Sequence, residues 1–204
     1  MIFIQHRVNT VKDLKTVPLS YGIEIDVRYH ENELVLHHDP FNHHNGKAET
    51  LENLLYSWQN HGPIILNLKT EGIEEQCIHL MAKFKIKEWF FLDMSMPFIV
   101  KYSFHKNIKN FNRDNLAVRF SEFEPLEYAI AFQDRVSWIW VDCFNNFALD
   151  NLSYQKIKNA NFKICLVSPE LQGHSLDRIK EFKDIIGSMT IDAICTKRPD
   201  LWKK

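Results

Sequence analysis

Short apolar runs alternate along the chain with longer stretches in which apolar residues recur at helical spacing. Eight of these runs have the length and apolar character of buried strands. We therefore expect strands at Ile2–His6, Gly22–Arg28, Ile64–Lys69, Trp89–Asp93, Leu116–Phe120, Trp138–Phe144, Phe162–Val167 and Ala193–Thr196.

The stretches between the runs predict helices. Ile73, Cys77 and Met81, for example, recur at the spacing of one helix face. Pro125 suits the first turn of a helix, where a missing N–H costs nothing. The predicted helices span Val11–Thr16, Thr50–Asn60, Ile73–Phe84, Pro97–Phe104, Pro125–Gln133, Asp150–Asn159 and Ser175–Ile186.

Regular alternation of strands and helices favours a parallel sheet with right-handed crossovers. Eight such units indicate an α/β fold of the TIM (β/α)8 barrel type, although an open, doubly wound sheet fits the same pattern. After the second run, Tyr29–Glu33 is turn-like and Leu34–Leu36 is a short extra run, which predicts a small hairpin. The 204 residues lie near the lower limit of roughly 200 for such a barrel, so we expect one compact domain over residues 1–204.

Polar residues occupy one face of the second predicted strand. Glu24, Asp26 and Arg28 alternate with three apolar residues, and alternate residues of a strand point to opposite faces. A solvated edge strand would show the same alternation. In a parallel barrel, however, helices cover the outer face, so we expect both carboxylates to point into the barrel.

Polar residues also gather where other predicted strands end. Asn67 and Lys69 share a face at the end of the third run, and His6 ends the first run just before Arg7. Arg119 and Asp142 lie near the ends of the fifth and sixth runs. Barrel enzymes build their sites at this end of the strands.

Two carboxylates on one strand face can share a hard cation such as Mg²⁺ or Ca²⁺. Glu24 and Asp26 are therefore candidate metal ligands, and Asn67 could add a neutral oxygen. An alternative for a Glu-x-Asp pair is ordinary ion pairing with neighbouring cations. The joint occurrence of these residues in one architecture favours the metal site.

Two histidines from different segments, His6 and His38, could serve as general base and general acid near neutral pH. Arg7 could hold a phosphate as a fork and Lys69 as a point charge. Either histidine could instead be a structural, hydrogen-bonded residue. A metal, two imidazoles and two cations together suit phosphodiester cleavage.

Composition narrows the class of protein. Lys and Arg total 25 against 26 Asp and Glu, which argues against a dedicated nucleic-acid binder. The apolar runs are too short to span a bilayer, and the N-terminus does not have the pattern of a signal peptide. The widely spaced cysteines favour reduced core thiols in a cytoplasmic protein over disulfides or a zinc site. Their positions are Cys77, Cys143, Cys165 and Cys195.

These residues resemble the glycerophosphodiester phosphodiesterases, a family within the phosphatidylinositol phospholipase C-like phosphodiesterase barrels. The family pattern begins with a strand ending in His-Arg, a Glu-x-Asp strand, a hairpin and His-Asp. Here His6-Arg7, Glu24-Ile25-Asp26 and His38-Asp39 match it, and Asn67-Leu68-Lys69 resembles the end of the third family strand. The segment Ile194–Leu201 resembles the closing Thr-Asp-x-Pro of the family.

The resemblance implies roles for the matching residues. His6 and His38 correspond to the acid–base pair, His38 being preferred over His37 because it directly precedes Asp39. Glu24 and Asp26 correspond to metal ligands for Mg²⁺ or Ca²⁺. The cations at positions 7 and 69 correspond to phosphate-binding residues.

Two further candidates rest on position alone. Arg119 could bind a second anionic group, and Asp142 could be an extra ligand or accept a substrate hydroxyl. The polar loop Ser168–His174 follows the seventh run on the same rim and lies either in the pocket or in an ordinary loop.

Three features depart from the family pattern. Val8 stands in place of the glycine that usually follows His-Arg. Asn67 replaces a common acidic ligand, which predicts weaker metal binding or a different metal preference. The large insertion before the third strand is reduced to Phe41–Glu49, which contains the pair His43-His44. The substrate can therefore differ from a simple glycerophosphodiester.

The sequence leads to a metal-dependent phosphodiester hydrolase acting on a small phosphodiester. One alternative is a lyase-type barrel that releases a cyclic phosphate. The other is a barrel that binds a phosphoryl ligand without turning it over; Val8 and Asn67 support it, and the retained histidines and carboxylates argue against it. Oligomeric state and alcohol head group are not encoded in these motifs.

Overall fold

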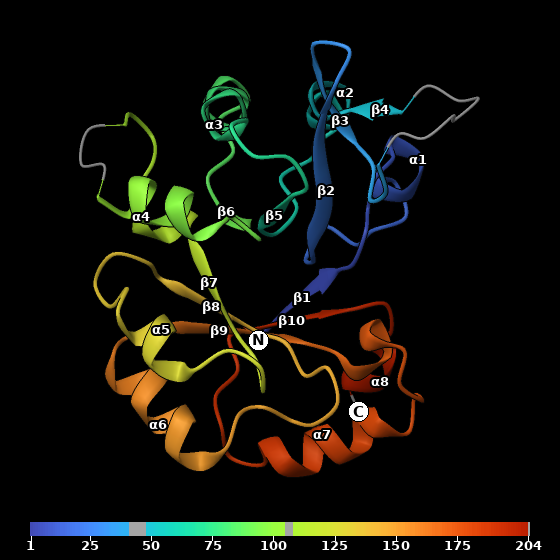
Figure 1. The fold of residues 1–204 in the computed structure, drawn as a ribbon. Coiled ribbons are helices and arrows are strands. Elements are labelled where there is room, and N and C mark those ends of the chain that lie inside the picture. The colour runs from blue at the N-terminus through green and yellow to red at the C-terminus, as the bar shows by residue number, and fades with distance from the viewer. Residues whose placement is uncertain (41–47, 105–107, 204) are drawn as a thin grey trace.

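The computed structural model describes residues 1–40, 48–104 and 108–203 of the chain (Figure 1). Its strands are β1 (Ile2–Gln5), β2 (Gly22–His30), β3 (Glu33–Leu36), β4 (Glu49–Thr50), β5 (Ile64–Leu68), β6 (Trp89–Leu92), β7 (Ala117–Phe120), β8 (Trp138–Val141), β9 (Lys163–Val167) and β10 (Ala193–Thr196). The α-helices are α1 (Val11–Leu14), α2 (Leu51–Tyr56), α3 (Glu74–Lys83), α4 (Met96–Phe104), α5 (Leu126–Ile130), α6 (Asn151–Asn159), α7 (Arg178–Ile186) and α8 (Pro199–Trp202). Short 3₁₀ turns lie at η1 (Arg113–Asn115) and η2 (Pro169–Gln172).

Parallel strand pairs run around a closed ring. β1 pairs with β2 on one side and with β10 on the other. The ring continues through β5 and β6 in one direction and through β9, β8 and β7 in the other. A parallel bridge between Phe91 and Leu116 joins β6 to β7. The predicted TIM barrel is confirmed, and the open sheet is excluded.

The predicted hairpin is also confirmed. β3 pairs antiparallel with β2, with Leu36 opposite Val27 and Glu33 opposite His30. The two-residue strand β4, which the apolar pattern did not reveal, adds to β3. Residues 41–47 lie outside the described residues, and with them His43, His44 and most of the segment expected to replace the family insertion.

The seven predicted helices form, with differences at their ends, and α8 is a further short helix that was not predicted. α2 begins after Thr50, whose side chain accepts a hydrogen bond from the Asn53 backbone N–H. Pro125 is the N-cap residue of α5 rather than part of its first turn. α7 begins at Arg178, because the preceding residues form a turn in which the Arg178 N–H donates to Ser175. None of the described helices combines the length and the apolar character that crossing a bilayer requires.

Two apolar layers lie on opposite faces of the barrel strands. Ile23, Ile25 and Val27 of β2 are fully buried and belong to the outer layer, between strands and helices. A smaller layer fills the interior; it comprises Ile4, Ile65, Phe90, Leu92, Ala117, Trp138, Trp140, Cys165, Val167, Ala193 and Cys195. Glu24 and Asp26 therefore point inward, as the alternation predicts. The four cysteines are buried and free, as expected.

The β6–β7 junction is the weakest joint of the ring. The described residues show one bridge there, whereas the other junctions carry ladders of two or more register pairs. Asn115 partly replaces the missing ladder. Its side-chain amide donates to the Trp89 carbonyl at 2.9 Å, and its Oδ1 accepts from the Asn112 N–H at 2.9 Å. A buried amide thus links the two halves of the barrel.

We expect Asn115→Ala to lower the free energy of unfolding by about 1–3 kcal/mol, because it leaves the buried Trp89 carbonyl without its side-chain donor and the Asn112 N–H without its acceptor. Urea denaturation monitored by fluorescence measures the change. Asn159→Ala, at an exposed position in α6, is the matched control and should stay within about 0.5 kcal/mol. Equal stability of Asn115→Ala and wild type would show that Asn115 does not stabilise this junction.

Candidate active site

Glu24 is buried in the barrel interior and held by two donors. Its Oε1 accepts from the Asn67 side-chain amide at 2.8 Å, and its Oε2 accepts from the Arg7 backbone N–H at 2.8 Å. Arg7 has a φ of 55°, in the left-handed region, and its N–H meets the carboxylate in this conformation. Burial, followed by the nearby charge of Asp26, raises the pKa of Glu24 to about 7.

Asp26, two residues further along β2, is fully buried and has a different set of partners. It forms a reciprocal pair with Asn9, whose side-chain amide donates to Oδ2 at 2.8 Å and whose Oδ1 accepts from the Asp26 N–H at 2.9 Å. Arg7 Nε lies 3.8 Å from Oδ2, and Lys69 Nζ lies 3.5 Å from Oδ1. The cations predicted to bind phosphate thus border this carboxylate.

Two oxygens of the predicted metal site have no hydrogen-bond partner among the described residues. They are Asp26 Oδ1 and Asn67 Oδ1, and both are buried. Buried acceptors without a hydrogen bond are rare, and a hard divalent cation satisfies carboxylate and amide oxygens of this kind. No three His, Cys, Asp or Glu side chains in the described ranges form a metal cluster. The donor set that fits is therefore two carboxylates with one neutral amide.

His6 follows β1 and lies next to the carboxylate pair. Its Nε2 is 3.7 Å from Glu24 Oε2, and its Nδ1 is buried with no partner in the described part of the chain. Burial, together with the charges of Arg7 and Lys197, lowers the pKa of His6 to about 4. The imidazole is therefore neutral at pH 7 and able to accept a proton. The charge of His38 also lowers the pKa of His6, so the two imidazoles are close enough to interact electrostatically.

His38 lies after β3, where its Nδ1 is 2.8 Å from Asp39 Oδ1. This contact holds the pKa of Asp39 below its usual value, so the carboxylate is ionised and accepts from Nδ1–H. Arg28 fixes the backbone, because its guanidinium donates to the carbonyls of His37, His38 and Lys69. Arg28, for which the sequence suggested no role, thus positions the backbone of His37 and His38.

A second charged cluster lies at the carboxyl ends of β6, β7 and β8, which with the ends of β1, β2 and β5 form the mouth of the barrel. Asp93 accepts a hydrogen bond from Arg119 and lies 3.7 Å from Lys69 Nζ. Arg119 Nη1 is 3.4 Å from Asp142 Oδ2. The structure therefore brings Arg119 and Asp142 together and places carboxylates on both sides of the guanidinium. Sequence reasoning missed Asp93, although it ends a predicted strand, the position that singled out the other candidates.

Asp142, directly after β8, is held by a neighbour on β8 and by one on the loop after β9. Trp140 Nε1 donates to Oδ2 at 3.1 Å, and the Gln172 side-chain amide donates to Oδ1 at 2.8 Å. Burial raises the pKa of Asp142 from 3.8 to about 6, against the opposing effect of Arg119. Gln172 belongs to the polar loop 168–174, so this part of the loop contacts the mouth of the barrel.

The departure at Val8 has a structural account. Its side chain is buried in the outer apolar layer, and its N–H donates to the Glu24 carbonyl at 2.9 Å. A valine at this position therefore packs against the core.

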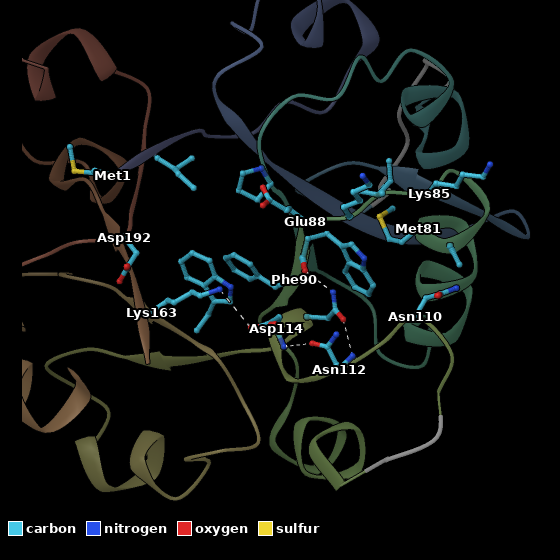
Figure 2. A pocket seen from close by; sticks show the side chains of 18 of the residues that line it. Met1, Met81, Lys85, Glu88, Phe90, Asn110, Asn112, Asp114, Lys163 and Asp192 are labelled. Carbon is cyan, nitrogen blue, oxygen red and sulfur yellow. Dashed lines mark hydrogen bonds and ion pairs between the residues drawn. The ribbon is translucent and has the colours of Figure 1, made fainter. Parts of the chain in front are cut away.

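A cavity of about 860 Å³ lies at the opposite end of the barrel (Figure 2). Glu88, Asp114, Lys163 and Asp192 are among the residues that line it, around the stacked rings of Phe90 and Trp138. None of the predicted site residues lines this cavity. It surrounds the N-terminal ends of the strands, the end of a TIM barrel that contributes stability rather than catalysis.

No protein-family model and no curated protein sequence matches the chain. Solved structures do match. A glycerophosphodiester phosphodiesterase from Agrobacterium tumefaciens str. C58 matches with a TM-score of 0.67 and 15% identity, over 99% of this chain and 98% of its own. The chain has the glycerophosphodiester phosphodiesterase fold. A glycerophosphoryl diester phosphodiesterase from Parabacteroides distasonis matches with a TM-score of 0.67 and 13% identity, over 98% of this chain and 84% of its own.

A third structure with this phosphodiesterase fold comes from Galdieria sulphuraria, a protein proposed to have the same activity. It matches with a TM-score of 0.70 and 15% identity, over 99% of this chain and 96% of its own. At this level of identity the likeness establishes the fold.

Asp142 provides a test of the mouth's electrostatics. Its folded-state pKa of about 6 lies above its ordinary value of 3.8, so its contribution to stability is present below about pH 3.8 and is lost as the pH rises through 6. Asp142→Asn should therefore flatten the pH dependence of the unfolding free energy between pH 4 and 6.5, by up to about 1.4 kcal/mol per pH unit.

The matched control is Asp184→Asn, at an exposed position in α7, which should leave the pH profile unchanged. Urea unfolding at a series of pH values measures both variants. An Asp142→Asn profile parallel to that of wild type would contradict the raised pKa.

Proposed function

We propose that the chain is a metal-dependent phosphoric diester hydrolase resembling the glycerophosphodiester phosphodiesterases, acting on a small phosphodiester. The observation that carries the proposal is the convergence of His6, His38 and the Glu24–Asp26 pair at the carboxyl ends of the strands. Solved phosphodiesterases with the same fold support it.

The phosphate would bind beside the carboxylate pair. Arg7 and Lys69 border Asp26 and offer a guanidinium fork and a point charge to the phosphoryl oxygens. Glu24, Asp26 and Asn67 would hold Mg²⁺ or Ca²⁺, which when bound offsets negative charge on those oxygens. Since Asn67 is neutral, this site carries one less negative charge than a three-carboxylate site, and we expect modest metal affinity.

The two histidines have environments suited to opposite proton transfers. His6 is neutral at pH 7, because its pKa is about 4, and can take a proton from the attacking water as the oxygen bonds to phosphorus. His38 is oriented by the ionised Asp39 and can give a proton to the departing alkoxide as the phosphorus–oxygen bond breaks. After the step His6 releases its proton to solvent and His38 takes one up, which restores the starting state, and the products are an alcohol and a phosphomonoester.

Histidine substitutions test the proposal. His6→Ala and His38→Ala should each lower kcat for glycerophosphoglycerol, whose alkoxide leaving group has to be protonated, at least about 100-fold, the usual contribution of general acid–base catalysis. The control His79→Ala lies at an exposed position of α3 and should retain full activity. Full activity in either active-site variant would refute the assignment.

The same assay identifies the nucleophile when a natural diester such as glycerophosphoglycerol is followed by phosphorus NMR. A phosphomonoester as the first product indicates attack by water. A cyclic phosphate as the first product indicates attack by a substrate hydroxyl, the alternative lyase-type reaction.

A further inference from the structure

Lys197 lies at the mouth of the barrel, immediately after β10. β10 pairs with β1 in a register that sets Thr196 opposite Gln5, so the next residues, Lys197 and His6, are neighbours. The His6 N–H also approaches the Thr196 carbonyl at 3.4 Å. Ile4 and Cys195 both lie in the interior apolar layer, and alternation gives His6 and Lys197 the same inward-facing parity.

The charge of Lys197 is not neutralised as the charges of the other mouth cations are. Arg7 and Lys69 border Asp26, and Arg119 borders Asp142. Lys197 is exposed and forms no ion pair within 4.0 Å with another side chain of the described ranges.

The backbone beneath Lys197 is held firmly. Glu170 Oε1 accepts from the Lys197 N–H at 3.1 Å and from the Thr196 hydroxyl, and its other oxygen accepts from the Ser168 hydroxyl. The Arg198 N–H donates to the Thr196 hydroxyl oxygen at 2.8 Å. The network holds the backbone N–H of Lys197 in place, and the Lys197 side chain is exposed.

We propose that Lys197 binds a second anionic group of the substrate, such as a carboxylate on one alcohol arm of the phosphodiester. The strand order β10–β1–β2 puts His6 between Lys197 and the Glu24–Asp26 pair. The scissile phosphate, close to Arg7 and Lys69, then leaves one arm to extend past His6 toward Lys197. This inference rests on the proposed phosphodiesterase function and specifies its substrate as a diester with an additional negative charge.

Binding of two matched ligands tests the inference independently of turnover. Dimethyl phosphate carries one negative charge, and carboxymethyl methyl phosphate carries a second. We expect amide chemical-shift titrations of the full chain to give tighter binding of the carboxymethyl ester. Lys197→Gln should weaken that binding about tenfold, the loss of one charge-assisted hydrogen bond, and should change dimethyl phosphate binding less than about twofold.

Lys197→Arg keeps the charge and should keep the preference. Lys87→Gln, at the opposite end of the barrel, is the matched control and should behave as wild type. Equal weakening of both ligands in Lys197→Gln would overturn the proposal, since Lys197 would then contact the common phosphate. An unchanged preference, or no binding of either ligand by wild type, would also overturn it.

Hydrolysis separates this inference from the proposed function. Wild type should cleave the p-nitrophenyl counterparts of both ligands, with the Lys197-dependent preference in kcat/KM. If the charge preference in binding persists while neither ester is cleaved, the proposed hydrolase activity fails and the anion site stands. If both esters are cleaved with no preference, the anion site fails and the hydrolase activity stands.

Discussion

Two buried carboxylates, Glu24 and Asp26, are the constraint on which the rest of the site depends. An ionised carboxylate in a barrel interior is unfavourable unless it is paired or hydrogen-bonded. The surrounding residues supply these partners: the backbone of Arg7, the amides of Asn9 and Asn67, and the ammonium of Lys69. The electrostatics that stabilise the carboxylates also assemble the cations that would meet a phosphate.

The fold makes this arrangement possible by dividing its strands between two layers. The outer faces of the strands pack against helices, and the inner faces pack a smaller apolar layer that gives way to charged residues toward the carboxyl ends. Neither Glu24 nor Asp26 lines the cavity at the other end of the barrel. Cavity volume alone favours the N-terminal ends of the strands, whereas the distribution of charge favours their carboxyl ends.

Periodicity in the sequence was sufficient to place the eight barrel strands and to orient Glu24 and Asp26, because helices cover the outer face of a parallel barrel and polar residues that alternate with apolar ones then point inward. It could not identify Asp93 or Gln172 as partners of Arg119 and Asp142, since these contacts join segments far apart in the chain. It also missed Asn9, whose pairing with Asp26 depends on the turn after β1. Hydrogen bonds between segments far apart in the chain produce no periodic pattern in a single sequence.

The most direct test of the central claim is calorimetric titration of Mg²⁺ and Ca²⁺ into the full chain. The account predicts one divalent ion per chain, bound by wild type and lost in Asp26→Asn. Asp142→Asn, which removes a buried carboxylate outside the carboxylate pair, should leave that binding intact. Absence of binding in wild type, or binding that survives Asp26→Asn, would contradict the claim that the buried pair forms a cation site.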